Sequence, residues 1–527
     1  MKGTTKMKLT ILATSDMHGY IKPSNFGAKE QDMPFGSAKV ATIIKEKKAA
    51  AAGPVLTIEN GDFIQGSPLS YYIARRKTPN DPSDLVNVLN LIDYDAAVLG
   101  NHEFNYGKDY LQQAIAAAKH PILAANIVNE QGEPAFGKAY EIFEKGGVKI
   151  AVLGMTTQYI PNWEHPTHIH GLTFKSIVDT AKEYVPKLRE LADVVVVSYH
   201  GGFEKELTTG EPTEALTGEN EGYELVTQVA GIDALVTGHQ HRVIATKLNG
   251  VPIIQPGFRG EYVGEITLTL DQNTQGTYVV TDSEAQLLET GNAIPDAAVL
   301  SSLAELSEEV EEWLDQPLGK VEGDMTIQDA DKARLTEHPY VEFIQKVQMD
   351  ATGTDISGTA LFNNEGKGFG SIITMRDVVT NYIYPNTLAV LRISGEDLKA
   401  ALEQSAAFFQ AETDGTIGIN PQFIEPKPQY YNYDMYEGIE YTINVKRPIG
   451  ERITTLLYKG KPVHAADWFD VTANQYRAVG GGNYGMYSAD KIIKEVQKDM
   501  TELIADYLVE HPVIFAETND NFKVVME

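Results

Sequence analysis

Acidic, amide and imidazole side chains recur in the first half of this chain, each just past a short apolar segment. These side chains are Asp16, His18, Asp62, Asn101, His102, His200, His239 and His241. Carboxylate oxygen, amide oxygen and imidazole nitrogen all suit divalent ions such as Mn, Zn and Fe, and one carboxylate can bridge two ions. The pattern therefore predicts a site for two divalent metal ions.

The spacing within the motifs is compatible with shared metal ligation. Asp16 and His18 are two residues apart, as are His239 and His241, so each pair can act together where the backbone stays extended past a strand. Asp62 and Asn101 each follow a glycine, which leaves room for close backbone approach. Seen alone, one Asp-x-His motif is more often a cap or a turn. Five motifs at the ends of apolar segments favour a common site.

A purely structural metal site is a weaker reading of the same residues. Structural sites are usually closed by four ligands, and this set of candidate side chains exceeds four. We therefore expect at least part of the set to serve catalysis.

The elements that must position these residues follow from the apolar segments. Segments such as "KLTILAT", "PVLTIE", "ADVVVVS" and "IDALVTG" have the length and composition of strands buried on both faces. Between some of them, "GSAKVATIIKEKKAAA" and "GKDYLQQAIAAAKH" predict helices. The result is a layered α/β domain over residues 1–290. In such sheets ligands bind outside the carboxyl ends of the strands, which is where the motifs lie.

The pattern changes beyond residue 290. "IPDAAVLSSLAELSEEVEEWLDQPLG" predicts an amphipathic helix that ends at Pro317, and we assign residues 291–320 to a helical linker. Residues 321–527 predict an α+β domain, in which Ser394 caps a helix that follows a strand.

Composition limits the classes of partner. The 527 residues exceed one ordinary core, and a net charge of −29 disfavours a nucleic-acid polymer. No apolar stretch is long enough to span a membrane, and no protein partner is evident. Without cysteine, no thiolate can hold a metal. No export signal precedes the first strand, so the expectation is a cytoplasmic protein, or an exported one whose leader has been removed.

The motifs together resemble a known family. "TSDMHG", "NGDFIQG", "LGNHEFNYG", "SYHGG" and "TGHQH" are similar to the ordered blocks of the calcineurin-like metallophosphoesterases, in particular their two-domain 5'-nucleotidase group. The resemblance implies a four-layer α/β/β/α first domain and a 5'-nucleotidase-type second domain. It places Asp16, His18, Asp62 and His241 on one metal and Asp62, Asn101, His200 and His239 on the other. Asp62 would bridge the ions, and His102 would be the catalytic histidine.

The second half resembles one branch of that group, the 2',3'-cyclic-nucleotide 2'-phosphodiesterase/3'-nucleotidases. The matching stretches are "YIYPNTLAVLRISGEDLKAALEQSA", "YYNYDMYEGIEYTINV" and "TANQYRAVGGGNYG". The resemblance implies that Tyr433 and Tyr476 stack on a nucleobase, a contact that contributes roughly 1 to 3 kcal/mol per base. Read from the residues alone, tyrosines in strands are usually packing residues.

Two departures from the 5'-nucleotidases also point to this branch. Asn105 stands where those enzymes carry an aspartate, so it can orient the His102 ring but cannot raise its pKa by charge. "LFNNEGKGFGS" replaces a loop whose arginine contacts the nucleotide, and lysine does not replace that bidentate group.

The expected function is therefore metal-dependent hydrolysis of nucleoside 2',3'-cyclic phosphates and 3'-nucleotides, with a small nucleotide as substrate. A 5'-nucleotidase or nucleotide-sugar hydrolase is one alternative, and a metal-stabilised nucleotide-binding protein without catalysis is another. A metal site and a base site on different domains also imply that the domains face each other during turnover, with rotation about residues 290–320 as a gating step.

A further histidine cluster, His165, His168 and His170, lies in "WEHPTHIHG". A third metal site is conceivable there, but Pro166, Gly171 and the lack of carboxylates beyond Glu164 favour a surface loop.

Overall fold

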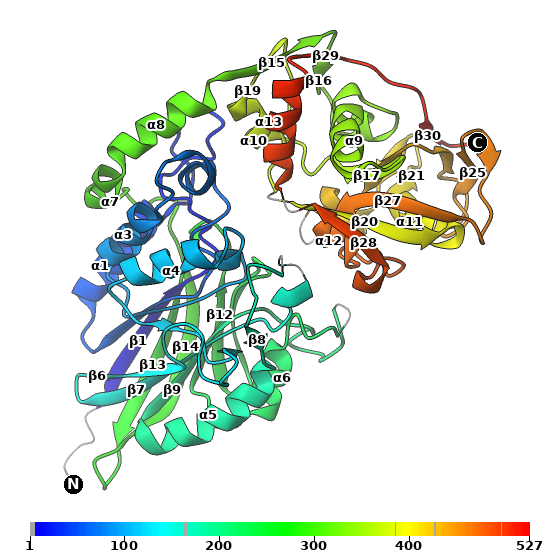
Figure 1. Cartoon of the computed structure of the whole chain (residues 1–527). Coiled ribbons are helices and arrows are strands. Elements are labelled where there is room, and N and C mark those ends of the chain that lie inside the picture. The colour runs from blue at the N-terminus through cyan, green and yellow to red at the C-terminus, as the bar shows by residue number, and fades with distance from the viewer. Residues whose placement is uncertain are drawn as a thin grey trace. The chain divides into compact units, whose positions relative to one another are not determined.

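The computed structural model contains two compact units, Met1–Val310 and Glu311–Glu527 (Figure 1). It describes residues 6–162, 164, 166–213, 216–384, 386–425, 428–496 and 498–527. The predicted linker, residues 291–320, is thus divided between the two units. Within the described ranges, no helix combines the length and apolar character needed to cross a membrane.

Two six-stranded sheets form the centre of the first unit. One has the order β14-β13-β1-β2-β3-β4, and the other has the order β11-β12-β10-β9-β7-β6. The strands of the first sheet are β1 (Met7–Thr14), β2 (Val55–Glu59), β3 (Ala96–Val98), β4 (Ile122–Leu123), β13 (Tyr262–Gln272) and β14 (Tyr278–Glu289). Those of the second are β6 (Tyr140–Lys145), β7 (Val148–Thr156), β9 (Val194–His200), β10 (Ala234–Val236), β11 (Val243–Leu248) and β12 (Val251–Pro256). β1, β2 and β3 run parallel, as do β7, β9 and β10, so their carboxyl ends share one edge in each sheet.

Alternating side chains of the central strands face two different cores. Val194 and Val196 of β9 pack between the two sheets, whereas Val195 and Val197 face the helices α5 (Ile177–Leu191) and α6 (Gly222–Gln228). The first sheet has helices beside it as well, namely α1 (Ser37–Ala50), α3 (Ser83–Ile92) and α4 (Lys108–Ala117) (Figure 1). The predicted four-layer α/β/β/α arrangement is confirmed, and burial on both faces explains the unbroken apolar runs.

The single helix predicted after residue 293 is wrong in one detail. Two helices occur, α7 (Ala297–Ser302) and α8 (Ala304–Leu314), because Leu303 leaves helical geometry at φ −120° and ψ 16°. Leu303 is nevertheless buried, so the apolar spacing continues across the break and conceals it. The helix ends slightly earlier than the predicted Pro317, since α8 ends at Leu314 and the strand β15 (Pro317–Glu322) begins at Pro317.

A mixed sheet with helices forms the second unit, as expected for an α+β domain. Its order is β23-β17-β27-β20-β28. These strands are β17 (Ile356–Ala360), β20 (Leu388–Ser394), β23 (Asp434–Glu437), β27 (Trp468–Asn474) and β28 (Ile492–Val496). Ser394 caps the helix α11 (Gly395–Ala406) in a reciprocal capping box with Asp397, which confirms the predicted cap.

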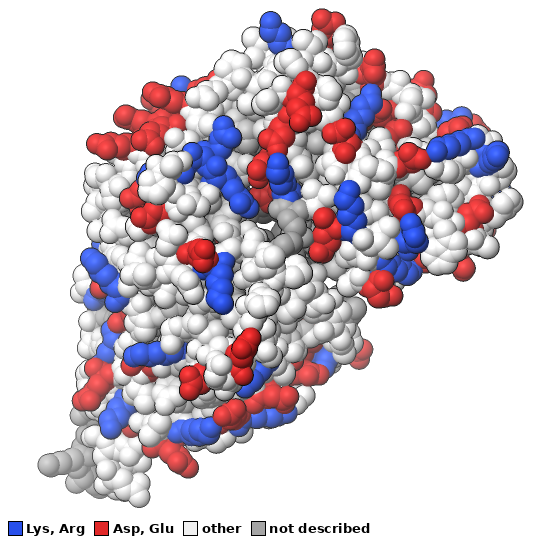
Figure 2. Space-filling model, viewed as in Figure 1, with Lys and Arg blue, Asp and Glu red and all other residues white. Residues whose placement is uncertain are grey.

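Acidic side chains outnumber basic ones in this chain, 73 to 44. On the face drawn in Figure 2, the two signs are interspersed over both units.

Three carboxylates lie together in the second unit. Glu342 in the helix α9 (Pro339–Thr352), Glu337 before it and Glu437 at the end of β23 each place an oxygen within 4.8 Å of the others. Lys346 lies 3.3 Å from Glu342. Burial, followed by the neighbouring Glu437 and Glu337, raises the pKa of Glu342 to about 9.

Stability is expected to fall as the pH rises through the interval between 4.5, the ordinary value, and about 9. The folded state keeps a proton on Glu342 that the unfolded chain releases, so rising pH favours unfolding. Urea unfolding free energies at about pH 5.5 and about pH 8.5 should differ less in Glu342→Gln than in the wild type. Glu312→Gln, an exposed change in α8, serves as control; an equal fall in wild type and Glu342→Gln would contradict the assignment.

Candidate functional site

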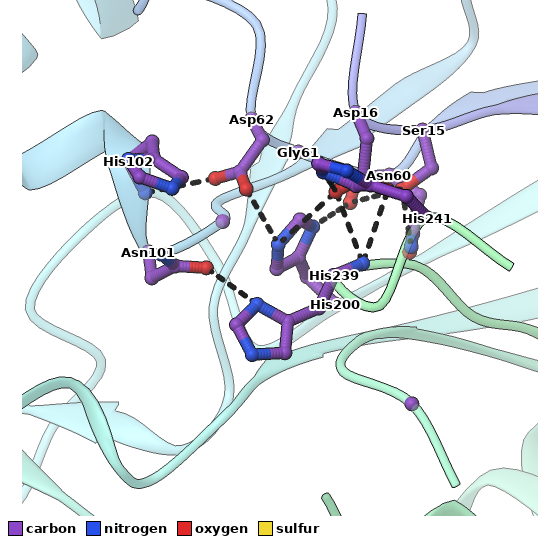
Figure 3. Close-up of polar contacts among 12 residues, drawn as sticks. Ser15, Asp16, Asn60, Gly61, Asp62, Asn101, His102, His200, His239 and His241 are labelled. Atoms are coloured by element: carbon purple, nitrogen blue, oxygen red, sulfur yellow. Dashed lines mark hydrogen bonds and ion pairs between the residues drawn. The ribbon is translucent and has the colours of Figure 1, made fainter. Parts of the chain in front are cut away.

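The predicted ligands converge at the carboxyl ends of the parallel strands in both sheets (Figure 3). Asp16 and His18 follow β1, Asp62 follows β2, and Asn101 follows β3. His200 is the last residue of β9, and His239 and His241 follow β10. Five chain segments that are distant in sequence therefore deliver these side chains to one place.

Within this site the side chains form two groups. Asp16, His18 and His241 place one potential ligand atom each within 4.8 Å of one another, and Asp62, His200 and His239 do the same. Asp62 also reaches toward the first group, with Oδ2 3.9 Å from His18 Nε2. Asn101 joins the second group, because its Oδ1 lies 2.9 Å from His239 Nδ1. The grouping has the composition that the sequence predicts for two ions.

Electron-rich atoms face one another at both groups. His18 Nδ1 donates to the Gln65 carbonyl, so in the neutral ring Nε2 carries the lone pair, and it lies 3.2 Å from His241 Nε2. His239 Nε2 lies 3.0 Å from the acceptor Glu219 Oε1, which directs the Nδ1 lone pair of a neutral ring toward Asn101. A bound cation would satisfy such facing lone pairs, and hydrogen-bonded second nitrogens are typical of histidines that hold metals.

His200 is the most deeply enclosed of the histidines in the site. Its Nδ1 donates to the Asn60 carbonyl at 2.6 Å, and its Nε2 is buried without a hydrogen bond of good geometry, 3.1 Å from Asp62 Oδ2. Burial lowers the pKa of His200, but Asp62 and Asp16 outweigh burial and raise it to about 10. Burial is the largest cause of the fall in the pKa of His18 to about 3, and the neighbouring His102 and His241 also lower it. The negative field at His200 would equally hold a cation in place of the proton.

Two carboxylates supply that field. Burial raises the pKa of Asp62, but His200 and His102 outweigh it, so the pKa lies well below its ordinary value. The same competition between burial and His200 lowers the pKa of Asp16. Both groups are therefore charged near neutral pH and available to a metal ion.

The backbone is left-handed and not extended at five of the seven predicted ligands. Asp16, His18, Asp62, His239 and His241 have φ between 48° and 67°, and they account for five of twelve such non-glycine residues among those described. The expectation of extended backbone at the two Asp-x-His-type pairs is thus wrong. Clusters of residues in sparsely populated backbone conformations are typical of functional sites.

Glu103 is a site residue that the sequence motifs did not single out as functional. It is 5% exposed and accepts hydrogen bonds from the backbone N–H groups of Asp62, Phe63, Ile64 and Gly100, at 2.6 to 3.3 Å. One carboxylate thus joins the turn carrying Asp62 to the turn carrying Asn101. A Cβ at Gly100 would overlap Asp62 Oδ1, which confirms the predicted need for glycine there.

His102 lies beside the ligand groups and belongs to neither. Its backbone N–H donates to Asp62 Oδ1 at 2.8 Å, and its Nδ1 lies 2.6 Å from Asn105 Oδ1. Asn105 therefore contacts the ring, and its role in orienting the ring stays a prediction. The arrangement leaves Nε2 as the atom able to face a substrate.

In the second unit, the two predicted stacking tyrosines differ in exposure. Tyr476 is 46% exposed, whereas Tyr433 is fully buried, with Phe408 stacked at 5.0 Å and Phe409 against it edge-on at 4.8 Å. The Tyr433 hydroxyl donates to the Arg334 carbonyl. The prediction that Tyr433 stacks on a nucleobase is therefore wrong, because Phe408 and Phe409 cover its ring and burial leaves no room for a base.

Tyr431, two residues before Tyr433, lies close to Tyr476, a contact that the sequence does not predict. The two ring centroids are 6.4 Å apart, at 75°. The buried Arg477 binds both segments, since it pairs with Asp434 at 2.7 Å and donates to the Tyr431 carbonyl at 2.7 Å. Arg334 is also buried, and it donates to the Asn364 side chain and to the Leu361 carbonyl. It thereby supports the loop of residues 361–371, which is the segment "LFNNEGKGFGS".

The additional histidine cluster is only partly described. His165 lies outside the described residues. His168 Nδ1 lies 2.7 Å from Glu164 Oε1, and His170 is in the same loop. Neither His168 nor His170 belongs to a group of potential metal ligands within the described part of the chain. The predicted loop agrees with the turns found over residues 166–171.

Two parts of the chain match known protein families. Residues 9–243 match the calcineurin-like phosphoesterases, and residues 317–489 match the 5'-nucleotidase C-terminal domain. A 2',3'-cyclic-nucleotide 2'-phosphodiesterase/3'-nucleotidase of Salmonella typhimurium is 32% identical, over 90% of this chain and 81% of that protein. A trifunctional nucleotide phosphoesterase of Bacillus subtilis is 27% identical over 98% of this chain, which spans 39% of that longer protein.

A solved structure agrees with these sequence matches. A Staphylococcus aureus protein described as a 5'-nucleotidase superimposes with a TM-score of 0.86 and 37% identity, covering 98% of this chain and 99% of that chain. The similarity thus extends over both units.

Proposed function

We propose, since the chain belongs to the calcineurin-like phosphoesterases that carry a 5'-nucleotidase C-terminal domain, that it hydrolyses nucleoside 2',3'-cyclic phosphates and 3'-nucleotides. The observation that carries the proposal is the pair of ligand groups around Asp62, with His102 beside them and outside both. The name of the Salmonella relative supports the choice of substrate. That family membership implies divalent metal ions.

The ligands present fit two such ions. Asp16, His18 and His241 would hold one ion, Asn101, His200 and His239 would hold the other, and Asp62 would contribute to both. Their oxygen and imidazole donors suit Mn, Zn or Fe. When bound, two ions neutralise phosphate charge and make a water nucleophilic near neutral pH.

His102 would act on the leaving oxygen. In the first reaction a water oxygen bonds to phosphorus and releases a proton, and the bond from phosphorus to the ribose 2' oxygen breaks. His102, carrying hydrogen on both ring nitrogens in this step, would donate its Nε2 proton to that oxygen. In the second reaction the bond to the 3' oxygen breaks in the same way, giving nucleoside and phosphate. The hydrogen bond to Asn105 supports the role, because it fixes the ring with Nε2 directed away from Asn105.

The second unit would bind the nucleobase. Tyr476 and Tyr431 supply partly exposed rings close together, and Arg477 and Asp434 hold the segments that carry them. Stacking tolerates every base, so this site predicts affinity for nucleosides with little base preference.

The test is a side-by-side assay of the purified protein on 2',3'-cyclic AMP, 3'-AMP, 5'-AMP and a UDP-sugar, with Mn²⁺ or after chelation. Metal-dependent turnover of the first two with little of the others is expected. Faster turnover of 5'-AMP or the UDP-sugar would favour the 5'-nucleotidase or nucleotide-sugar hydrolase alternative. Binding without turnover under any metal would favour a non-catalytic nucleotide-binding protein.

A further inference from the structure

A chain of short hydrogen bonds runs outward from His102. Its Nδ1 lies 2.6 Å from Asn105 Oδ1, and Asn105 Nδ2 donates to Glu164 Oε2 at 2.8 Å. The other carboxylate oxygen, Glu164 Oε1, lies 2.7 Å from His168 Nδ1. Glu164 is nearly buried, at 9% exposed, and is 59 residues from Asn105 in sequence.

The carboxylate of Glu164 determines which group donates in the hydrogen bonds between it and His102. A carboxylate only accepts, so Glu164 requires the NH₂ side of the Asn105 amide. The amide oxygen must then face His102, and Nδ1 of that ring must carry a hydrogen. Without Glu164 the Asn105 amide could rotate by half a turn and present its NH₂ group to Nδ1, which would reverse the roles.

Asn105, Glu164 and His168, the residues of this hydrogen-bond series beyond His102, belong to neither of the two metal-ligand groups. The His168 ring lies against the turn that carries Asn105, since a Cβ at Gly107 would meet it at 3.4 Å. The hydrogen bonds therefore tie the loop of residues 166–170 and the turn after β3 to one carboxylate.

We propose that Glu164 is the positioning residue for His102: by fixing the orientation of the Asn105 amide it holds His102 with Nδ1 protonated and Nε2 toward the substrate. The inference rests on the proposed function for its kinetic consequence. In the 5'-nucleotidases an aspartate three residues after the histidine supplies a carboxylate. In this protein Glu164 would supply the carboxylate instead, acting through Asn105.

An exchange of the amide and the carboxylate tests this order of donors and acceptors. Asn105→Asp places two carboxylates against each other and should lower kcat by about tenfold with little change in KM. Adding Glu164→Gln restores an amide donor to an acceptor, so the double variant should recover at least about fivefold over Asn105→Asp. Glu265→Gln, a carboxylate of similar burial paired with Lys47, is the matched control and should keep wild-type kcat.

The assay uses whichever phosphoester the wild type hydrolyses, and metal content and thermal unfolding are measured for every variant. Histidine ¹⁵N chemical shifts, assigned by comparison with His102→Gln, report the protonated nitrogen of His102 whether or not turnover occurs. Hydrogen on Nδ1 in the wild type and double variant, with a change in Glu164→Ala, is expected. An Asn105→Asp variant as active as the wild type, or a His102 tautomer unaffected by Glu164→Ala, would overturn the proposal. Absence of wild-type turnover would instead count against the proposed function alone.

Discussion

Replacement of Asp62 by alanine is expected to remove metal binding and to lower kcat by about 10³-fold or more. Asp62 is 1% exposed, lies 3.1 Å from His200 Nε2 and 3.9 Å from His18 Nε2, and accepts from the His102 backbone at 2.8 Å. Asp62 thus contacts both ligand groups and the turn that carries His102. Metal ions per chain, measured by mass spectrometry after dialysis, and kcat with added Mn²⁺ should both fall.

Asp282→Ala, a change at an exposed carboxylate of β14, serves as the control for the loss of one negative charge. If Asp62→Ala kept two ions per chain and wild-type turnover, the assignment of Asp62 between the two groups would be wrong.

Replacement of His102 by alanine is expected to lower kcat by about 10²- to 10⁴-fold, with metal content unchanged. The ring of His102 belongs to neither ligand group, so its removal takes away a proton donor and no metal ligand. The backbone N–H that donates to Asp62 persists in alanine, and the ligand turn should therefore keep its geometry. Steady-state kinetics on the best substrate and metal analysis of the same sample provide the measurement.

Added imidazole offers a positive control, because it can enter the space left by the ring and restore part of the activity. Loss of metal together with activity would place His102 among the ligands. Unchanged turnover would exclude it as the proton donor and move that role to another group of the site.

The candidate metal site could be predicted from sequence because its information is local. Each ligand follows an apolar run, and parallel strands bring their carboxyl ends to one edge without further knowledge. The helix at residues 395–406 was predictable for the same reason, since Ser394 and Asp397 mark its start within four residues.

The supporting carboxylates could not be predicted, because their partners are distant in sequence. Glu103 meets the turn of Asp62 about 40 residues away, Glu164 meets Asn105 across 59 residues, and Glu219 meets His239 across 20. The prediction that Tyr433 stacks on a nucleobase was wrong for a related reason. Residues 431 and 433 are both tyrosines, and only the packing of Phe408 and Phe409 in the folded chain determines which of the two is buried.

The left-handed backbone at five ligands also limits which residues evolution or a protein engineer can place there. Among residues other than glycine, asparagine, aspartate and histidine enter that conformation most readily, and β-branched residues scarcely do. Metal coordination and backbone geometry therefore favour the same few residue types at these positions. Glutamate could supply an equivalent oxygen to a metal, yet it lacks the conformational preference that aspartate brings at residues 16 and 62. Tolerance to substitution at these turns should thus be narrower than ligand chemistry alone allows.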